Sequence, residues 1–196
     1  MNHYYTDDQP LSSNRREIPF RFFGMDFQLV SSDALFSKQR IDQGTLVLLE
    51  AIINLNPSGS LLDLGAGIGV VGVVLKKQFP LLEIIMSDVT QHAVEIATEN
   101  IKTLGLDIPV LKSDGFAEID QTFDWIILNP PIRAGKKVIY RLFEESLERL
   151  NPKGSLIIVM RKKHGLNSAI AFLEEKAVSI EKLMNKSNYH VLRIWK

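Results

Sequence analysis

The chain has 196 residues, a normal length for one compact domain, and 45% of them are hydrophobic, which is enough to build a sizeable core. Lys and Arg together number 23, as do Asp and Glu, so the formal net charge is zero. A cationic field over the whole molecule is therefore excluded, and any nucleic-acid binding needs a local basic patch. The absence of cysteine excludes disulfides, thiolate zinc sites and a cysteine nucleophile. The four histidines are scattered, so we expect no metal site.

The N-terminus shows no basic region followed by an apolar stretch, and no apolar run approaches the roughly 20 residues that span a bilayer. We expect a soluble, cytoplasmic protein without a membrane partner, either a monomer or a weak homodimer. Residues 1–16 are polar and predict a flexible extension, and residues 17–196 predict a single domain. Within that domain, residues 17–56 predict a hairpin and a helix, and residues 57–196 the core.

The predicted elements begin with a β-hairpin, because aromatic residues are enriched on both sides of Gly24, at 19–23 and 26–30. Asp42 is in position to cap a helix with apolar residues on one face, and the turn at 56–59 ends this helix.

From residue 60 onward, strands alternate with helices, which predicts an α/β fold with a mostly parallel sheet and helices on both faces. The last two strands are separated by too few residues for a crossover helix, so they should pair antiparallel. The strands are predicted at 61–64, 82–86, 108–111, 123–128, 156–160, 178–183 and 189–195.

A glycine-rich segment follows the first strand of this core, and residues 63–69 read Asp-Leu-Gly-Ala-Gly-Ile-Gly. Ligands of open α/β sheets bind at this edge, and glycines let them approach the backbone. Asp63 is expected to accept hydrogen bonds from loop amides and to favour a cationic ligand. Gly67, Gly69 and Gly72 match the spacing of a dinucleotide loop, but out of register with the strand end. The alternative pattern, D-x-G-x-G, suits S-adenosylmethionine, and a bare turn stays open from the motif alone.

Two more acids follow strands at the same edge. Asp88 could accept both ribose hydroxyls or cap the next helix, although Thr90 could supply that cap instead. Asp114 could accept from an adenine amino group, or it could form a common turn pair with Gly115.

The segment Asn129-Pro130-Pro131 ends the fourth strand of the core and combines rigidity with two acceptors. An exocyclic base amine is a poor nucleophile because its lone pair delocalises into the ring. The side-chain oxygen of Asn129 and the carbonyl of Pro130 could accept from its N–H groups and direct the lone pair at a methyl donor. The prolines fix the direction of both acceptors in advance, so alignment provides most of the catalysis. A plain rigid turn is the alternative.

These motifs together resemble the class I methyltransferases that act on amino nitrogens. Residues 30–37, 42–45 and 129–136 look like the small-domain ribosomal RNA guanine-N2 methyltransferases, closest to compact single-domain members. The resemblance covers nearly the whole chain. It implies a Rossmann-like sheet of seven strands, mostly parallel with an antiparallel last strand, and S-adenosylmethionine as cofactor. It assigns catalysis to Asn129, Pro130 and Pro131, and cofactor contacts to Phe36, Asp63, Gly65, Ala66, Gly67, Asp88, Val89, Asp114, Gly115 and Asn129.

The sequence departs from the family pattern at two positions. Ala66 stands where many relatives have Cys, and Ile132 where adenine- and glutamine-modifying relatives often have Tyr or Phe. The second departure removes an aromatic platform for a flipped base and argues against adenine as the target. Phe36 could also be an ordinary core aromatic.

Two basic clusters follow the fourth and fifth strands and predict phosphate contacts around a target base, although a solvated surface is the usual role of such runs. They consist of Arg133, Lys136, Lys137 and Arg141, and of Arg161, Lys162, Lys163 and His164. The function predicted is methylation of guanine N2 in ribosomal or other structured RNA. Methylation of a protein glutamine or a small amine is the alternative within enzymes. An NAD-dependent oxidoreductase and an RNA-binding module without catalysis are less favoured.

Overall fold

The computed structural model describes residues 15–33, 40–176 and 179–196. Its elements are β1 (Arg15–Phe22), β2 (Met25–Ser32), α1 (Gln43–Leu55), β3 (Ser60–Leu64), α2 (Val70–Gln78), β4 (Glu83–Asp88), α3 (Gln91–Thr103), β5 (Val110–Lys112), β6 (Phe123–Leu128), η1 (Ile132–Ala134), α4 (Lys136–Glu148), β7 (Leu150–Arg161), η2 (Lys162–His164), α5 (Leu166–Glu174), β8 (Ser179–Lys186) and β9 (Tyr189–Trp195).

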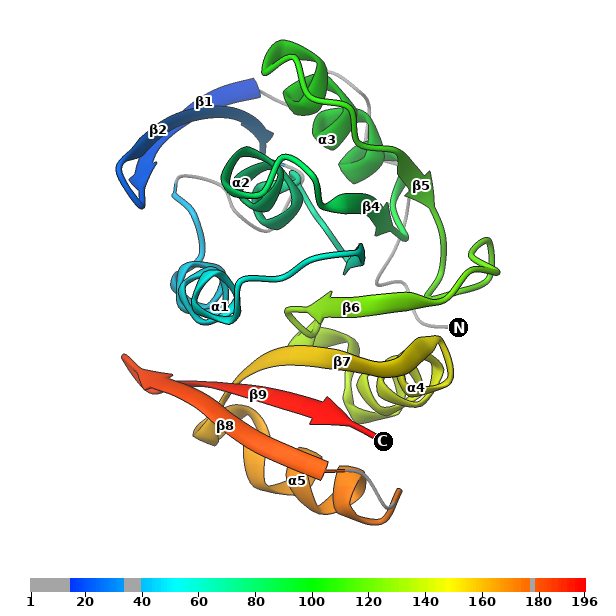
Figure 1. The fold of residues 1–196 in the computed structure, drawn as a ribbon. Coiled ribbons are helices and arrows are strands. Elements are labelled where there is room, and N and C mark those ends of the chain that lie inside the picture. The colour runs from blue at the N-terminus through cyan, green and yellow to red at the C-terminus, as the bar shows by residue number, and fades with distance from the viewer. Residues whose placement is uncertain (1–14, 34–39, 177–178) are drawn as a thin grey trace.

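The core is a seven-stranded sheet with the order β5-β4-β3-β6-β7-β9-β8 (Figure 1). The strands from β5 to β7 are parallel, and β9 runs antiparallel to both β7 and β8. This confirms the predicted parallel sheet with a reversed last strand. Residues 1–14, which make up most of the predicted extension, lie outside the described residues, and β1 begins at Arg15.

The helices cover both faces of the sheet, with α1, α2 and α3 on one side and α4 and α5 on the other (Figure 1). Adjacent residues of a strand contribute to opposite faces: Ile127 of β6 joins the first core, whereas Ile126 and Leu128 join the second. All three side chains are at most 1% exposed. This two-sided burial explains why the central strands are continuously apolar.

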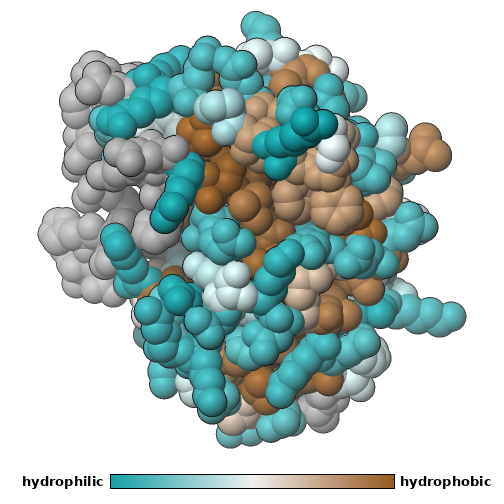
Figure 2. Space-filling view, turned by 90° about the vertical axis from the view of Figure 1, so that its left-hand side faces the viewer, coloured by the Kyte–Doolittle hydropathy of each residue, from teal (hydrophilic) through white to brown (hydrophobic). Residues whose placement is uncertain are grey.

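The predicted N-terminal hairpin is confirmed, with Phe23 and Gly24 at positive φ in its two-residue turn. Aromatic side chains of the hairpin pack on the first core but leave apolar surface, and Phe23 is 48% exposed. Figure 2 shows apolar side chains reaching the surface among hydrophilic ones on this side of the molecule.

A buried asparagine of α3 attaches the hairpin to the core. Asn100 accepts from the backbone N–H of Val30 at 2.6 Å and donates to the carbonyls of Val30 and Ile68, each at 2.9 Å. Val30 belongs to β2, and Ile68 to the glycine loop after β3. One side chain therefore connects three segments that are distant in the sequence.

Residues 151–154, Asn-Pro-Lys-Gly, are typical of a turn, but in the structure they are part of β7. The strand starts at Leu150, which pairs with Phe123, and the register shifts before Trp125 pairs with Ser155. Lys153 takes a φ of 70° inside this irregularity. The turn-forming residues thus make a bulge, which lets the strand continue beyond them.

Because Asn100 is 1% exposed, its removal would leave three backbone groups without partners. We expect Asn100→Ala to lower the free energy of unfolding by at least about 2 kcal/mol in urea denaturation. Thr98→Ala on the same helix is the matched control, because Thr98 is exposed and, among the described residues, bonds only to the carbonyl of Val94. It should change stability by no more than about 0.5 kcal/mol. Equal effects of the two substitutions would contradict this role of Asn100.

Candidate active site

The predicted site segments meet because the parallel strands end at one edge of the sheet. Leu64 at the end of β3 pairs with Ser87 of β4 on one side and with Leu128 of β6 on the other. The glycine loop and Asn129 therefore follow β3 and β6, and Asp88 is the last residue of the adjacent strand β4. This is the edge at which open α/β sheets bind their ligands.

The glycine loop is held against β4 by backbone hydrogen bonds. Gly65 and Ala66 both donate to the carbonyl of Ser87, at 2.8 and 2.9 Å. The φ angles of Gly65 and Gly67 are 73° and 58°, which favour glycine. A Cβ added at either position would meet no atom of the described residues within 4 Å. The loop is thus an open cradle in which a ligand can approach the backbone, and it fits S-adenosylmethionine in this respect.

Asp88 fixes this loop from the neighbouring strand. Its Oδ2 accepts from the Gly67 N–H at 2.9 Å, and its Oδ1 accepts from the N–H and hydroxyl of Thr90 at 3.0 and 3.1 Å. Thr90 caps α3 by accepting from the N–H of Ala93, which confirms the alternative cap predicted for that helix. A carboxylate has about four lone-pair positions, so Asp88 keeps acceptor capacity for a ligand hydroxyl. Its neighbour Val89 is half-buried.

Asp63 is buried at the end of β3, and its contact differs from the expectation. Its Oδ2 accepts from the N–H of Gly72 in α2, at 3.0 Å, while the loop amide of Gly67 goes to Asp88. The Asp63 side chain is thus bonded to the first turn of α2. Burial raises the pKa of Asp63 to about 7; the Gly72 hydrogen bond opposes this rise, and the charge of Asp88 adds to it.

Gly72 is the third glycine of the spacing that is typical of a dinucleotide-binding loop. Its surroundings in the structure explain in a different way why a glycine stands here. A Cβ at this position would lie 2.1 Å from Cε of Met86 and 3.0 Å from its Cγ. Met86 is fully buried in β4. Close packing of α2 on the sheet therefore accounts for this glycine without a phosphate.

Asp114 follows β5 and is exposed, in an ion pair with Arg141 of α4. Arg141, which belongs to the first of the two basic clusters, also pairs with Glu145. Two acids therefore balance the charge of this guanidinium, which leaves it less available to a phosphate. Gly115 is buried at a φ of 59°, and a Cβ there would lie 2.2 Å from Glu145.

Asn129 follows β6 and is half-buried, with Pro130 buried behind it. Its Nδ2 donates to Oδ2 of Asp42 at 3.2 Å and to the hydroxyl of Thr45 at 3.1 Å. Asp42 also caps α1, as predicted, by accepting from the Thr45 N–H at 3.1 Å. Sequence reasoning gave Asp42 the capping role alone and missed its contact with Asn129. Pro131 is half-buried and leads into η1.

The basic residues after β7 surround a hollow lined by Arg161, Lys162, Lys163 and Asn188. The guanidinium of Arg161 lies 5.0 Å from the ring centre of Tyr189 in β9. Its Nε is buried and has no hydrogen-bond partner within residues 15–33, 40–176 and 179–196. The stacking on Tyr189 was not predicted. Three further basic residues, which follow β6, are exposed: Arg133, Lys136 and Lys137.

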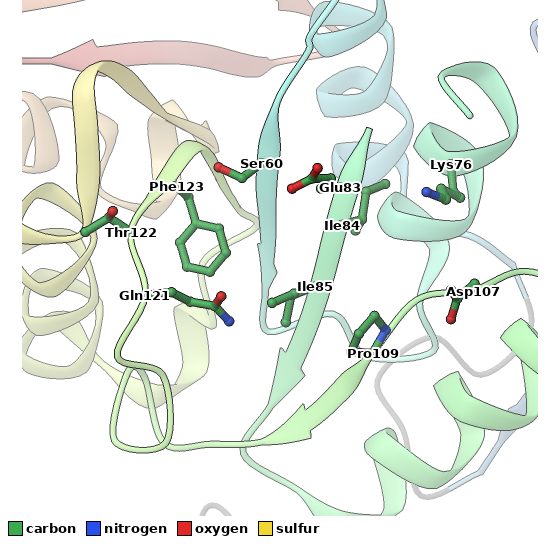
Figure 3. Close-up of a pocket in the computed structure, with 10 residues that line it drawn as sticks. All are labelled: Ser60, Lys76, Glu83, Ile84, Ile85, Asp107, Pro109, Gln121, Thr122 and Phe123. Carbon is green, nitrogen blue, oxygen red and sulfur yellow. The ribbon is translucent and has the colours of Figure 1, made fainter. Parts of the chain in front are cut away.

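A second hollow lies at the opposite edge of the sheet, where β3, β4 and β6 begin (Figure 3). Its lining includes Ser60, Lys76 and Glu83. The Lys76 amine already donates to the carbonyl of Leu82 at 2.8 Å, and Ser60 is bonded to Asp124. Because this hollow is far from the loop edge, we do not include it in the site.

Some expectations concern features that the structure does not test. Phe36 lies outside the described residues. The described part of the chain holds no group of three or more His, Cys, Asp or Glu side chains placed to bind a metal ion. Likewise, none of its helices is long and apolar enough to cross a membrane.

Comparison with known proteins gives a family and named relatives. The sequence model of the methyltransferase small domain family matches residues 26–193. A Bacillus subtilis (strain 168) relative, the uncharacterized protein YbxB, is 38% identical over 97% of this chain and 96% of its own length. The ribosomal RNA small subunit methyltransferase C of Actinobacillus pleuropneumoniae serotype 7 (strain AP76) is 34% identical over 83% of this chain. The chain spans 50% of that relative's length.

Solved structures show the same architecture. The T. thermophilus 16S rRNA N2 G1207 methyltransferase (RsmC), in complex with AdoMet and guanosine, superposes with a TM-score of 0.83 at 26% identity. This match covers 96% of the present chain and 52% of the other. A ribosomal protein L11 methylase of Lactobacillus delbrueckii subsp. bulgaricus matches with a TM-score of 0.69 at 22% identity over 80% and 84% of the two chains, which shows a shared fold.

The raised pKa of Asp63 predicts a pH-dependent stability. In the folded protein the protonated carboxyl is favoured, so the stabilisation is complete below the ordinary pKa of 3.8 and is lost as the pH rises through about 7. Asp63→Asn keeps an acceptor for Gly72 but does not titrate. In urea unfolding, the stability of this variant relative to the wild type should therefore rise by roughly 3 kcal/mol from pH 4.5 to pH 8.

The matched control for this measurement is Asp124→Asn. Hydrogen bonds from Ser60, and another from Asn151, hold the pKa of Asp124 below its usual value. It is ionised in both folded and unfolded chains above pH 4.5, so its difference from the wild type should stay constant over the same range. A constant difference for Asp63→Asn as well would show that burial does not protonate Asp63.

Proposed function

This chain belongs to the methyltransferase small domain family and is a methyltransferase, and we propose that it methylates N2 of guanine in ribosomal or other structured RNA, with S-adenosylmethionine as donor. The observation that carries the proposal is the rigid Asn129-Pro130-Pro131 segment at the end of β6, next to the open glycine cradle of β3. The relatives named as ribosomal RNA methyltransferases support the substrate class.

S-adenosylmethionine, when bound, supplies a methyl group on a cationic sulfur. Gly65 and Gly67 give it an open backbone, and Asp88, which already accepts three hydrogen bonds, offers its remaining acceptor position to a ribose hydroxyl. Asp63, once ionised, adds negative potential behind the loop. We propose further cofactor contacts for Phe36, Ala66, Val89, Asp114, Gly115 and Asn129.

The amine is activated by alignment. Oδ1 of Asn129 and the carbonyl of Pro130 accept from its two N–H groups, so the lone pair leaves conjugation with the ring and points to the methyl carbon. Proline fixes φ near −65°, which restricts the segment before the substrate arrives. The nitrogen loses its proton only after the new bond has formed, so no strong base is needed. Holding the atoms at about 3 to 3.5 Å contributes most of the rate.

RNA binding rests on the basic residues at the same edge. Lys162 and Lys163 are exposed beside the hollow, and Arg161 keeps an unpartnered Nε within the described part of the chain. On a protein with zero formal net charge, such a concentration favours phosphate contacts. Arg133, Lys136 and Lys137 extend this surface in the proposal. A glutamine amide or a small amine could use the same acceptors but has no need for the cations.

The proposal predicts that Asn129→Ala loses transfer but loses much less of its affinity for the cofactor, because Asn129 is only one of several proposed cofactor contacts. Loss of one preorganised polar group should lower kcat on the order of 100-fold or more. The assay offers labelled S-adenosylmethionine to total RNA, ribosomal subunits and cell protein, and calorimetry follows cofactor affinity. Label in protein and not in RNA would refute the substrate class, and unchanged turnover by the variant would refute the role of Asn129.

A second prediction concerns salt. Lys162→Ala with Lys163→Ala should weaken RNA binding and reduce the slope of log affinity against log salt by about 1.4 to 1.8 if both lysines bind phosphates. The matched control replaces two exposed lysines at the opposite edge, Lys102 in the last turn of α3 and Lys153 near the start of β7. It removes the same charge, and its slope should equal that of the wild type. An equal change in both variants would mean that only net charge matters.

A further inference from the structure

The N-terminus of α1 meets the end of β6 at the side chain of Asn129. Oδ2 of Asp42 accepts from Nδ2 of Asn129 and from the Thr45 N–H, so one oxygen both caps α1 and holds the amide. The Thr45 hydroxyl is the second acceptor, at 3.1 Å from Nδ2. Both N–H groups of the Asn129 amide therefore have a partner at the N-terminal end of α1.

These contacts determine which way the amide faces. An ionised carboxylate can only accept hydrogen bonds, so the side of Asn129 that faces Asp42 has to carry the NH₂ group. A flipped amide would set its own oxygen against the carboxylate and lose both bonds. Oδ1 then points away from α1, and no described residue donates to it. The reactive acceptor is left free by the same contacts that orient it.

Gly44 shows that this arrangement needs a close fit. A Cβ at this position would lie 2.8 Å from Oδ2 of Asp42 and 2.7 Å from the Tyr189 ring. Residue 44 is buried and its φ does not call for glycine, so the requirement comes from contact alone. Any side chain there would push the carboxylate away from Asn129.

We propose that Asp42 and Thr45 are positioning residues that lock the Asn129 amide with Oδ1 toward the target amine. This inference rests on the proposed function, because it assigns the orientation of the acceptor in that reaction. Neither residue touches the substrate. Both act on the rate through Asn129, as outer partners do when they orient a ligand side chain.

The test uses Thr45→Val, which keeps the shape of the side chain but removes its acceptor, and Thr45→Ser, which keeps the hydroxyl. Asp42→Ser combined with Thr45→Val removes both acceptors for Asn129, because the shorter serine still caps α1 but does not reach the amide. Unmethylated small-subunit ribosomal RNA made by transcription is the substrate. We expect kcat to fall about 10-fold in Thr45→Val and about 100-fold in the double variant, with the KM for RNA and the cofactor Kd unchanged. Thr45→Ser should match the wild type.

A second measurement does not depend on turnover. The side-chain NH₂ resonances of Asn129 are assigned by NMR from their loss in Asn129→Ala. They should shift and exchange faster with water in Thr45→Val and in the double variant, and stay unchanged in Thr45→Ser. If the double variant is as active as the wild type, or loses activity while these resonances stay in place, the positioning role is wrong.

The two proposals fail in different ways. A wild-type protein that methylates no RNA would refute the proposed function. The Asn129 resonances still decide the orientation in that case, because unchanged signals in the double variant overturn the lock and shifted signals support it.

Discussion

The parallel register of β3 with its two neighbours is the constraint on which the site depends. Leu64 pairs with Ser87 and with Leu128, so three strands end at the same level and their following residues share one edge. The carbonyl of Ser87 then accepts from both Gly65 and Ala66, which attaches the loop to β4. A slip of one residue would turn every buried side chain of β3 to the other face, so the two cores fix this register.

Two carboxylates stabilise the loop region by different means. Asp88 is half-buried, and donors from the loop and from Thr90 satisfy it, so it shapes the backbone of Gly67 directly. Asp63 is 3% exposed and has one backbone donor, on α2, so burial opposes its ionised form. A cationic ligand beside it would favour ionisation. The Asp63 carboxylate, whose ionised form is disfavoured by burial, thus lies where a cationic methyl donor would stabilise its negative charge.

The acceptor side of the site is rigid on both flanks. Prolines restrict the backbone after Asn129, and α1 restricts its amide through Asp42 and Thr45. Such restraint is useful because an amide that rotates freely would present its donor to the amine half of the time. The basic hollow beside β7 shows another case of support from a neighbour, since Tyr189 of β9 stacks on Arg161. The reversed strand therefore contributes to the basic hollow as well as to the sheet.

The sequence by itself determined the alternation of strands and helices, the hairpins and the edge at which the motifs gather. These follow from local periodicity and from short turns, which act within a few residues: β6 and β9 have the predicted bounds. Only the tertiary structure decided the partners of individual polar groups. Asp42 reaches Asn129 across 87 positions, Asn100 joins the hairpin to the loop, and Arg141 pairs with Asp114. Such contacts depend on how helices dock on the sheet, and docking is set by packing of the whole core, which no local pattern encodes.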